Sequence, residues 1–434
     1  MSSPNRSSKA SPGRRAAWQA LSSWLTIGPG DARLGSPSKP FPPKRLEPRD
    51  RAQAKRLAEG CVKRWASLEH ILRELAGGKR PRPNALRAAL LLGAYELLFE
   101  KGSKPHATVH EAVTLAGEAA GKGGASFANA LLRKIAARPV AKEWLQEAGI
   151  AVRYSLPDSF VQKKMEELGP EEAEKLFEIF LQPAHLCLRV QRLRTDTDSL
   201  CEALSSQGFS CEKGIHPGTL VLPDPSHGAI LETKEFKGGL FTIQDCSHVE
   251  IVDVLGPQPG ERILDLCAAP GTKATAIAEA SKDQVEVFCF DTNQNRLQGI
   301  LSERKRLGLG SLRLLGSVQE LQALCQKKLM DRVLVDAPCS NTGVLHRRAE
   351  ARWHFAPDKL DGFVETQRRL LAQAAGYLRP GGTLVYSTCS LEPEENELLA
   401  RDMADQLGLR LLSTERILPI HQARDGSGVS VFRK

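Results

Sequence analysis

The second half of the chain alternates short apolar segments with longer helical ones, and this alternation constrains the fold more than any other feature of the sequence. Such an alternation is typical of a parallel sheet covered by helices on both faces. We therefore expect an α/β domain over residues 236–434. Ligands of open parallel sheets bind beyond the carboxyl ends of the strands, so the candidate site consists of residues that directly follow a strand. The expected strands are residues 262–266, 285–290, 331–335 and 383–387.

A chain of 434 residues is long enough for two to three domains. Apolar residues recur at three- and four-residue spacing near the N-terminus, which predicts an all-helical domain over residues 12–139. Residues 28–48 are so rich in glycine and proline that we expect a loop there. The stretch 140–235 mixes strand and helix candidates, which indicates a small α+β linker module. The helices expected in the first domain are 14–25, 52–75, 84–99, 109–120 and 125–136, and the strands expected in the module are 186–190 and 219–222.

Basic residues are concentrated in the helical third of the chain. The first 138 residues contain 25 Lys and Arg against 10 Asp and Glu, whereas the remaining residues contain 35 against 41. Clustered cations release counterions from phosphates, so this third is a candidate nucleic-acid surface. A solvated surface that only keeps the protein soluble is the alternative.

The cysteines and the hydropathy pattern predict where the protein works. The ten cysteines include no Cys-x-x-Cys pair, which fits a reducing cytoplasm better than a disulfide framework. No apolar run approaches the roughly 18 residues of a membrane helix. We expect a cytoplasmic monomer with no membrane segment, and we assign no metal site.

Two strand ends indicate a cofactor that contains a nucleoside. The first expected strand runs into a turn of small residues followed by a helix, so a ligand can approach the turn and the free amides of the helix start; a simple tight turn is the alternative. The second strand is followed by Asp291, which could accept hydrogen bonds from a ribose diol or cap the next helix. No Gly-x-Gly-x-x-Gly or Walker motif is present, which argues against nicotinamide and nucleoside triphosphates. The turn consists of Cys267, Ala268, Ala269, Pro270, Gly271, Thr272 and Lys273.

The other two strand ends each carry a cysteine. Cys339 follows strand 331–335 and Cys389 follows strand 383–387, with 50 positions between the two cysteines. A single cysteine near a strand is usually a small buried hydrophobic residue. Two cysteines at the same edge of one sheet indicate instead a shared chemical role.

Three of these segments resemble the signature blocks of the Sun-family RNA 5-methylcytosine methyltransferases. Residues 87–95 and 106–133 are similar to the NusB-like helical RNA-binding domain found in family members that act on ribosomal RNA. The resemblance implies a Rossmann-like methyltransferase domain, S-adenosylmethionine as cofactor and small-subunit ribosomal RNA as substrate. The segments that carry the resemblance are 268–271, 336–340 and 387–397, and Arg347, Arg348, Arg352 and Trp353 between them also fit.

The resemblance also implies a role for each site residue. Cys389 would be the nucleophile that adds to carbon 6 of cytosine and activates carbon 5. Cys339 would help to remove the proton from carbon 5 and to release the product. Asp336 would hold the N3/N4 edge of the cytosine or, as the alternative, the ammonium group of the cofactor. Residues 267–273 would face the cofactor, and Asp291 would bind its ribose.

Two other functions remain open from the sequence. Thr272 stands where the family usually has a second glycine, which favours a catalytically weak RNA-binding or ribosome-assembly factor. A tRNA cytosine-5 methyltransferase is the other alternative, although the NusB-like segment disfavours it.

Overall fold

The computed structural model describes residues 10–35, 41–100, 102–223, 227–419 and 424–434. The chain divides into two compact units, which we call the helical unit and the sheet unit. The helical unit comprises Met1–Leu181 and Arg348–Ala356, and the sheet unit comprises Gln182–Arg347 and Pro357–Lys434. Residues 36–40 of the loop expected at 28–48 lie outside the described residues.

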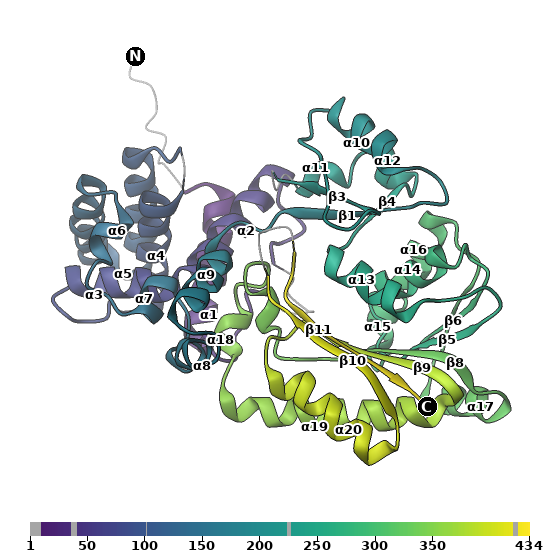
Figure 1. Ribbon diagram of the computed structural model, residues 1–434. Helices are drawn as coiled ribbons and strands as arrows, with labels where there is room; N and C mark the ends of the chain where they lie inside the picture. Colours follow the sequence, from purple (N-terminus) through teal and green to yellow (C-terminus); the bar gives the residue numbers. More distant parts are fainter. Residues whose placement is uncertain (1–9, 36–40, 101, 224–226, 420–423) are drawn as a thin grey trace. The chain divides into compact units, whose positions relative to one another are not determined.

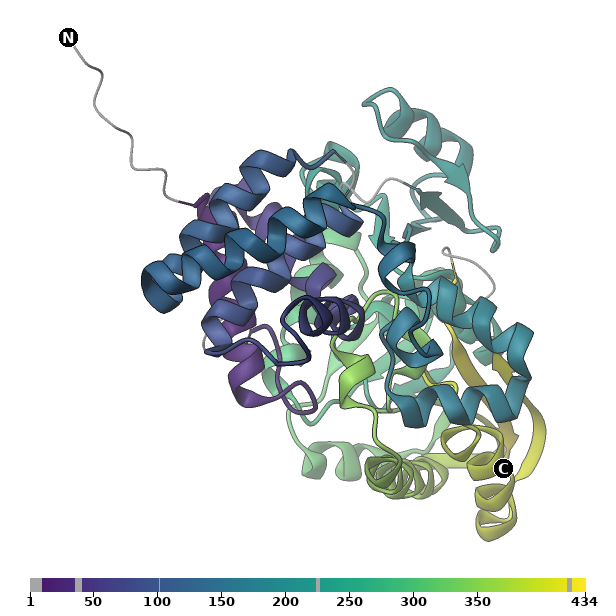
Figure 2. The same ribbon diagram turned by 90° about the vertical axis from the view of Figure 1, so that its left-hand side faces the viewer.

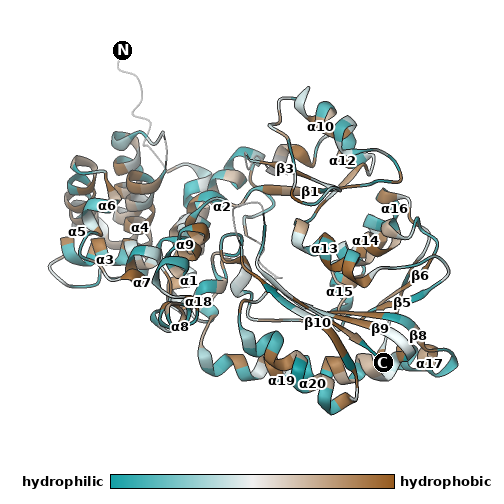
Figure 3. Cartoon of the chain, viewed as in Figure 1, coloured by the Kyte–Doolittle hydropathy of each residue, from teal (hydrophilic) through white to brown (hydrophobic). Residues whose placement is uncertain are grey.

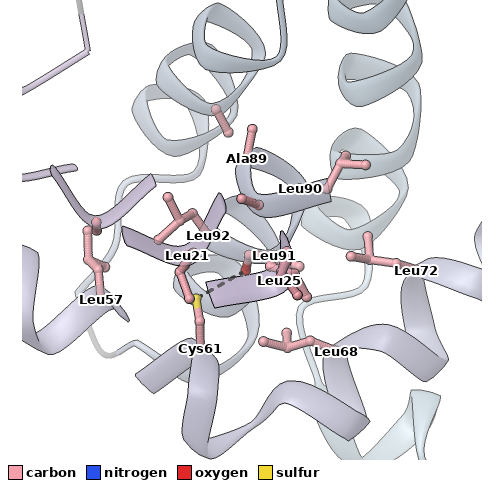
Figure 4. Packing of buried hydrophobic residues seen from close by; sticks show 14 of the residues in the cluster. Leu21, Leu25, Leu57, Cys61, Leu68, Leu72, Ala89, Leu90, Leu91 and Leu92 are labelled. Carbon is pink, nitrogen blue, oxygen red and sulfur yellow. Dashed lines mark hydrogen bonds between the residues drawn. The ribbon is translucent and has the colours of Figure 1, made fainter. Parts of the chain in front are cut away.

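The described part of the helical unit contains no strand, and its helices pack side by side in both Figure 1 and Figure 2. The core lies between α1, α2, α3 and α4, where leucines from all four helices meet (Figure 4). Ala89, Leu90, Leu91 and Leu92 of α4 are all fully buried, as expected for a helix that is apolar on every side. The helices of this unit are α1 (Pro12–Ile27), α2 (Pro48–Lys63), α3 (Trp65–Leu75), α4 (Asn84–Phe99), α5 (Pro105–Ala137), α6 (Ala141–Trp144), α7 (Ile150–Tyr154), α8 (Asp158–Leu168), α9 (Pro170–Leu181) and α18 (Ala351–His354).

Two breaks in the helices of this unit bear on the predictions, one against them and one in their favour. The helix expected over 52–75 is two helices, because Arg64 leaves helical geometry between α2 and α3. The helices expected over 109–120 and 125–136 are confirmed as two, because the backbone of α5 leaves helical geometry at Ala120 and Gly121, between the two expected helices. Gly121 has a φ of 64°, a conformation that glycine adopts without strain.

The sheet unit begins with a small antiparallel sheet of order β2-β3-β1-β4, covered by short helices. Its core includes Leu188, Leu220 and Phe241, which are fully buried. A small α+β module is therefore confirmed, but its expected bounds 140–235 are not those of the structure: residues 140–181 belong to the helical unit, and β4 of the small sheet lies beyond residue 235. The elements are β1 (Leu186–Val190), α10 (Thr197–Ser205), β2 (Glu212–Lys213), β3 (Thr219–Leu222), α11 (His227–Ile230), α12 (Lys234–Lys237) and β4 (Phe241–Ile243).

The rest of the sheet unit is a seven-stranded sheet of order β10-β11-β9-β8-β5-β6-β7. Strands β5 to β9 are parallel, whereas β10 and β11 run antiparallel at one edge. The four predicted strands are β5, β6, β8 and β9. The elements are α13 (Cys246–Leu255), β5 (Arg262–Asp265), α14 (Thr272–Ala280), β6 (Glu286–Cys289), α15 (Gln294–Leu297), α16 (Gly299–Leu307), β7 (Leu312–Leu314), α17 (Val318–Lys327), β8 (Met330–Asp336), η1 (Thr342–Val344), α19 (Pro357–Tyr377), β9 (Leu378–Thr388), η2 (Pro393–Glu395), α20 (Glu397–Leu407), β10 (Arg410–Ile417) and β11 (Ser427–Arg433).

Helices cover both faces of this sheet, with α13, α14 and α16 on one side and α17, α19 and α20 on the other (Figure 1). Neighbouring residues of one strand therefore enter different cores: Ile263 packs under α14, and Leu264 packs in the core that contains residues of α19. Figure 3 shows both apolar and polar segments along α19 and α20, as expected for helices with one buried face. The fold is the α/β arrangement expected from the alternation of the sequence.

None of the helices within the described ranges is long and apolar enough to cross a membrane.

Candidate active site

The thiols of Cys339 and Cys389 meet at the carboxyl edge of the seven-stranded sheet. Cys339 lies three residues beyond β8 and Cys389 directly follows β9, and these two strands are parallel neighbours. The two sulfur atoms are 3.2 Å apart, and both cysteines are free thiols. Cys339 is buried and Cys389 is partly exposed. The structure therefore brings together two predicted site residues that are 50 positions apart in the sequence.

Asn341 bridges the two cysteines. Its side-chain nitrogen donates to the carbonyl oxygen of Cys339 over 2.7 Å, and its side-chain oxygen accepts from the thiol of Cys389 over 3.3 Å. Asn341 has a φ of 62°, in the left-handed region that asparagine tolerates better than most residues. The side chain thus supports the geometry of the pair from the loop that follows Cys339.

Cys339 is a thiol whose surroundings favour the protonated form. The hydrogen bond with Cys389, burial and the charge of Cys389 all raise the pKa of Cys339 well above its ordinary value. Cys267, in the predicted cofactor turn, has no thiol partner of this kind. Burial, and next the carboxylates of Asp265, Asp336 and Asp291, raise its pKa. A thiol in such negative and apolar surroundings is a poor nucleophile, so Cys267 belongs to the wall of the site.

A single buried carboxylate, Glu395, fastens the loops of both cysteines. It accepts hydrogen bonds from the backbone nitrogen and the hydroxyl group of Ser340, at 3.0 and 2.5 Å, and from the hydroxyl group of Ser390. Gln367 of α19 donates to the same carboxylate over 2.9 Å. Burial raises the pKa of Glu395, and these hydrogen bonds oppose that increase without cancelling it. Because Ser340 follows Cys339 and Ser390 follows Cys389, Glu395 limits how far the two sulfurs can separate.

Asp336 ends β8 beside the cysteine pair and is held in its ionised form. Lys273 donates to one carboxylate oxygen over 2.7 Å, and the hydroxyl group of Ser387 donates to the other over 2.9 Å. Burial opposes ionisation, but Lys273 and His248 together lower the pKa of Asp336 below its ordinary value. Burial, and next the charge of Lys273, lower the pKa of His248 of α13 itself.

Asp265, at the end of β5, is a buried carboxyl group whose side-chain oxygens have no hydrogen-bond partner among the described residues. Burial, and next the charge of Asp336, raise its pKa to about 7. An unpaired buried carboxylate is costly, and a cationic ligand group would remove that cost. This acid therefore fits the ammonium group of an amino-acid-type cofactor.

The predicted cofactor turn joins β5 to α14 and closes against a neighbouring helix. Gly271 has a φ of 104°, and a Cβ atom there would lie 2.6 Å from Cγ1 of Ile300. Asp291 accepts from the backbone nitrogens of Ala269, over 3.0 Å, and Asn293, over 2.7 Å. The residue that caps α15 is Asn293, so the helix-cap alternative for Asp291 is wrong.

Arg189 of β1 ties the small antiparallel sheet to the start of α14. Its guanidinium group pairs with Glu279 over 2.8 Å and donates to the carbonyl oxygen of Thr272 over 2.7 Å. Both partners of the ion pair are buried, and Gln244 accepts a further hydrogen bond from the same guanidinium group. Thr272, which departs from the family pattern, is thus the first residue of α14 and is held from outside the helix.

The segment that carries Arg352 and Trp353 belongs to the helical unit. Arg352 is fully buried and donates to the carbonyl oxygens of Lys63 and Ser155. The ring nitrogen of Trp353 donates to Val62 over 2.9 Å, and its ring meets that of Trp65 edge-on at 4.8 Å between centroids. These two residues therefore anchor the segment within the helical unit. Arg347, just before the segment, pairs in the sheet unit with Asp245 and Asp425.

Sequence reasoning did not assign roles to Asp265, Glu395, Asn341, His248 or Arg189. Glu395 and Asn341 lie within or beside the quoted motifs, so their proximity to the cysteines was a usable signal. His248 and Arg189 lie far from those motifs in sequence, and only the fold brings them to the site. Among the described residues, no group of three or more His, Cys, Asp or Glu side chains could hold a metal ion.

Comparison with protein families matches all three parts of the chain. A family described as 16S rRNA methyltransferase RsmB/F matches residues 252–423. The NusB family matches residues 11–137, and an RsmF/B-like ferredoxin-like domain matches residues 156–227.

Individual relatives extend over most of the chain. The probable ribosomal RNA small subunit methyltransferase B of Synechocystis sp. is 34% identical over 361 residues, which cover 81% of this chain and 80% of that protein. The protein of the same description in Bacillus subtilis is 30% identical, with 88% and 87% covered. A solved structure of a methyltransferase homolog protein from Pyrococcus horikoshii is 29% identical and covers 65% of this chain and 97% of its own, with a TM-score of 0.57.

Proposed function

This chain belongs to the RsmB/F family of 16S rRNA methyltransferases and uses S-adenosylmethionine, and we propose that it methylates carbon 5 of a cytosine in small-subunit ribosomal RNA. The observation that carries this proposal is the distance of 3.2 Å between the sulfur atoms of Cys339 and Cys389. Carbons 5 and 6 of cytosine are bonded neighbours. Two sulfurs this close can act on the two ends of that one bond.

Cys389 is the nucleophile. Its thiol loses its proton to the solvent that it partly faces, and the thiolate forms a bond to carbon 6 of the cytosine. The electrons of the carbon 5–carbon 6 double bond then make carbon 5 nucleophilic. Cys389 suits this step because it is the partly exposed member of the pair, whereas the surroundings of Cys339 favour its protonated form. When bound, S-adenosylmethionine supplies the electrophilic methyl group that carbon 5 takes.

Cys339 acts second. Two of the causes that raise the pKa of Cys339, the hydrogen bond with Cys389 and its charge, are lost once the sulfur of Cys389 is bonded to carbon, whereas burial remains. Cys339 can then release its proton to solvent and accept the proton from carbon 5. The electrons of that C–H bond restore the double bond, and the bond between carbon 6 and Cys389 breaks.

Two carboxylates have separate roles: Asp336 would contact the substrate, and Asp265 would contact the cofactor. Ionised Asp336, held by Lys273 and Ser387, accepts from the amino group of the cytosine. Asp265 would hold the ammonium group of the cofactor, because its oxygens have no other partner among the described residues. The turn 267–273 would line the cofactor, and Asp291 would hold its ribose with the acceptor capacity that its two backbone contacts leave.

The test compares Cys339→Ala with Cys389→Ala after incubation with S-adenosylmethionine and transcribed 16S rRNA. We expect Cys339→Ala to form the covalent bond to RNA but not to resolve it, so a protein–RNA species accumulates on a denaturing gel. Cys389→Ala forms no such species. Cys201→Ala, a change of the same kind in the small antiparallel sheet's module, should turn over like the unmodified protein.

The roles are wrong if both variants or neither variant traps RNA. Trapping by Cys389→Ala alone would exchange the two roles. Binding of rRNA by both variants, with no methyl transfer by the unmodified protein, would favour the RNA-binding or assembly-factor alternative.

A further inference from the structure

The helical unit contains a pocket of about 370 Å³, which none of the functions discussed above uses. Its volume falls within the range of roughly 300 to 1,000 Å³ that is usual for ligand sites. One wall is the connection between α3 and α4, and the other is the part of α5 that begins at its kink. The residues around it are Ala76, Lys79, Arg80, Pro81, Arg82, Leu86, Ala120, Gly123, Gly124 and Phe127.

The charges around this pocket have a single sign. Lys79, Arg80 and Arg82 contribute three cations, and no lining residue is acidic. Arg80 lies 3.5 Å from Glu69, a carboxylate that also pairs with the buried Arg87. Neither Lys79 nor Arg82 makes an ion pair or a hydrogen bond through its side chain with any residue that the structure describes. The two exposed cations are therefore available to an anion.

Part of the pocket lining is apolar and includes an aromatic ring. Phe127 is only partly buried, although it packs against the core of the helical unit. Leu86, Pro81 and Ala120 line the same space. Gly123 adds no side chain, and a Cβ atom there would have no neighbour within 4 Å. A flat apolar ring could therefore enter beside Phe127.

Cations and an aromatic ring in the lining of one pocket match the two parts of a nucleotide. Phosphates pair with Lys and Arg side chains, and bases stack on aromatic rings regardless of their sequence. A base must be unpaired to stack in this way, which excludes regular duplex RNA. An acidic peptide would satisfy the cations but would leave the ring without a planar partner.

We propose that this pocket binds one nucleotide of a single-stranded segment of the substrate RNA, with its phosphate between Lys79 and Arg82 and its base against Phe127. The proposal rests on the proposed function for the identity of that RNA. It makes the pocket a docking site for RNA outside the target cytosine. Variants of the pocket should therefore alter the binding of RNA and leave that of S-adenosylmethionine unchanged.

The experiment measures the affinity of the full chain for fluorescent dodecauridylate by anisotropy at several salt concentrations. Removing two phosphate contacts should lower the slope of log K against log salt by about 1.4 in the double variant Lys79→Gln/Arg82→Gln. The matched control, Arg51→Gln/Lys134→Gln, removes the same charge from exposed positions of the unit outside the pocket and should change the slope far less.

A second pair of variants tests the base. Phe127→Leu keeps an apolar side chain but loses the aromatic face, and it should weaken the binding of dodecauridylate roughly tenfold. Gly123→Ala should bind normally, whereas Gly123→Trp should fill the pocket and weaken binding to a similar extent. Unchanged melting temperatures of the free proteins would exclude a loss of folding as the cause.

Equal salt slopes for the two double variants, or unchanged binding of dodecauridylate by Phe127→Leu and Gly123→Trp, would contradict the proposal that this pocket binds a nucleotide. The catalytic proposal is tested separately, by the trapping of RNA in Cys339→Ala. In the pocket variants, only the KM for 16S rRNA should rise. If the unmodified protein does not methylate rRNA but the pocket variants lose dodecauridylate binding, the catalytic proposal is wrong. The proposal that the pocket binds RNA is then still supported.

Discussion

At the scale of single residues, the thiol pair depends on side chains that never touch the substrate. Glu395 is one of them: its carboxylate accepts from Ser340, Ser390 and Gln367 in a position with no solvent access. Groups that act by positioning others should affect the chemical step more than the binding of either ligand. Glu395 is therefore a positioning residue, and we expect its replacement to change the rate of the chemical step more than the binding of either ligand.

Glu395→Gln places an amide nitrogen where two serine hydroxyl groups now donate. We expect kcat to fall at least tenfold with little change in the Kd of S-adenosylmethionine, because only the distance between the sulfurs is disturbed. The free energy of unfolding should fall by about 1–3 kcal/mol, the cost of a buried polar group with a poor partner. Urea unfolding and single-turnover kinetics measure the two effects.

The control for that variant is Glu365→Gln on the exposed face of α19, where 65% of the side chain is exposed. It should change neither quantity. A normal single-turnover rate in Glu395→Gln would show that the carboxylate does not position the cysteines.

Asp265 gives the cofactor site a pH dependence. Its pKa of about 7 means that the carboxyl group is protonated below that pH and ionised above it. Only the ionised form attracts an ammonium group, so the affinity for S-adenosylmethionine should be highest above pH 7 and fall as the pH decreases through it. One pH unit below the pKa, about one carboxyl group in eleven is ionised, so we expect roughly tenfold weaker binding at pH 6 than at pH 8.

Isothermal titration at pH 6 and pH 8, in two buffers of different ionisation enthalpy, measures both the affinity and the proton released. In Asp265→Asn, binding should be weaker and the dependence on pH should disappear. Equal affinities at the two pH values in the unmodified protein would exclude Asp265 as the partner of the ammonium group.

At the scale of elements, the start of α14 decides whether the cofactor turn can form. Gly271 combines a positive φ with close contact to Ile300, so two separate constraints select glycine at this position. Arg189 fixes the next residue from the small antiparallel sheet. The turn at the start of α14 is therefore held from outside by Ile300 of α16 and by Arg189 of β1.

Gly271→Ala should disturb this junction. The left-handed backbone conformation costs a residue with a Cβ atom about 1–3 kcal/mol, and the contact with Ile300 adds to that cost. We expect a lower melting temperature and at least a tenfold weaker binding of S-adenosylmethionine, measured by thermal unfolding with and without the cofactor. Gly299→Ala on α16, where a Cβ atom would meet nothing within 4 Å, should leave both unchanged.

The elements differ in how far the sequence could predict them. Helix 84–99 and strands 186–190 and 219–222 have the predicted bounds, because a continuous apolar pattern ends at each side in a turn signal. The antiparallel strands β10 and β11 were not expected, since β10 is largely exposed and its strand geometry depends on pairing with β11. The spacing of apolar residues in a sequence predicts which residues are buried. It does not predict a strand that forms only because it pairs with a neighbouring strand.

The same limit applies to the site. The cysteines, Asp336 and the cofactor turn follow strands, a place that the rules of parallel sheets indicate in advance. The role of Glu395 depends on a contact with two loops at once, and no local pattern encodes such a contact. Asp291 shows the opposite case, where two roles were open and the structure assigns the helix cap to Asn293.

At the scale of the whole molecule, the chain leaves the sheet unit after Arg347, contributes Arg348–Ala356 to the helical unit and returns at Pro357. This excursion lies between the two cysteines in sequence. Arg352 and Trp353, which fit the family pattern, therefore support the fold of the helical unit, although the residues on either side belong to the sheet unit. Motif membership alone could not separate these structural residues from the catalytic ones.

Trp353→Ala tests this assignment. Loss of a large aromatic side chain from a packed site costs about 3–5 kcal/mol, so the end of α2 and the start of α3 should exchange amide hydrogens faster. Hydrogen exchange measured by mass spectrometry should show this change near Val62 and Trp65, and the affinity for S-adenosylmethionine should stay normal. Leu398→Ala, at an exposed position of α20, is the control. Unchanged exchange near Val62 would mean that Trp353 does not anchor the segment.

The most direct measurement of the two-thiol mechanism is peptide mass spectrometry of the species trapped by Cys339→Ala. After digestion of protein and RNA, the peptide that contains Cys389 should carry a cytidine with one added methyl group. A trapped species linked through any other residue, or a complete absence of cytidine on the Cys389 peptide, would contradict the mechanism.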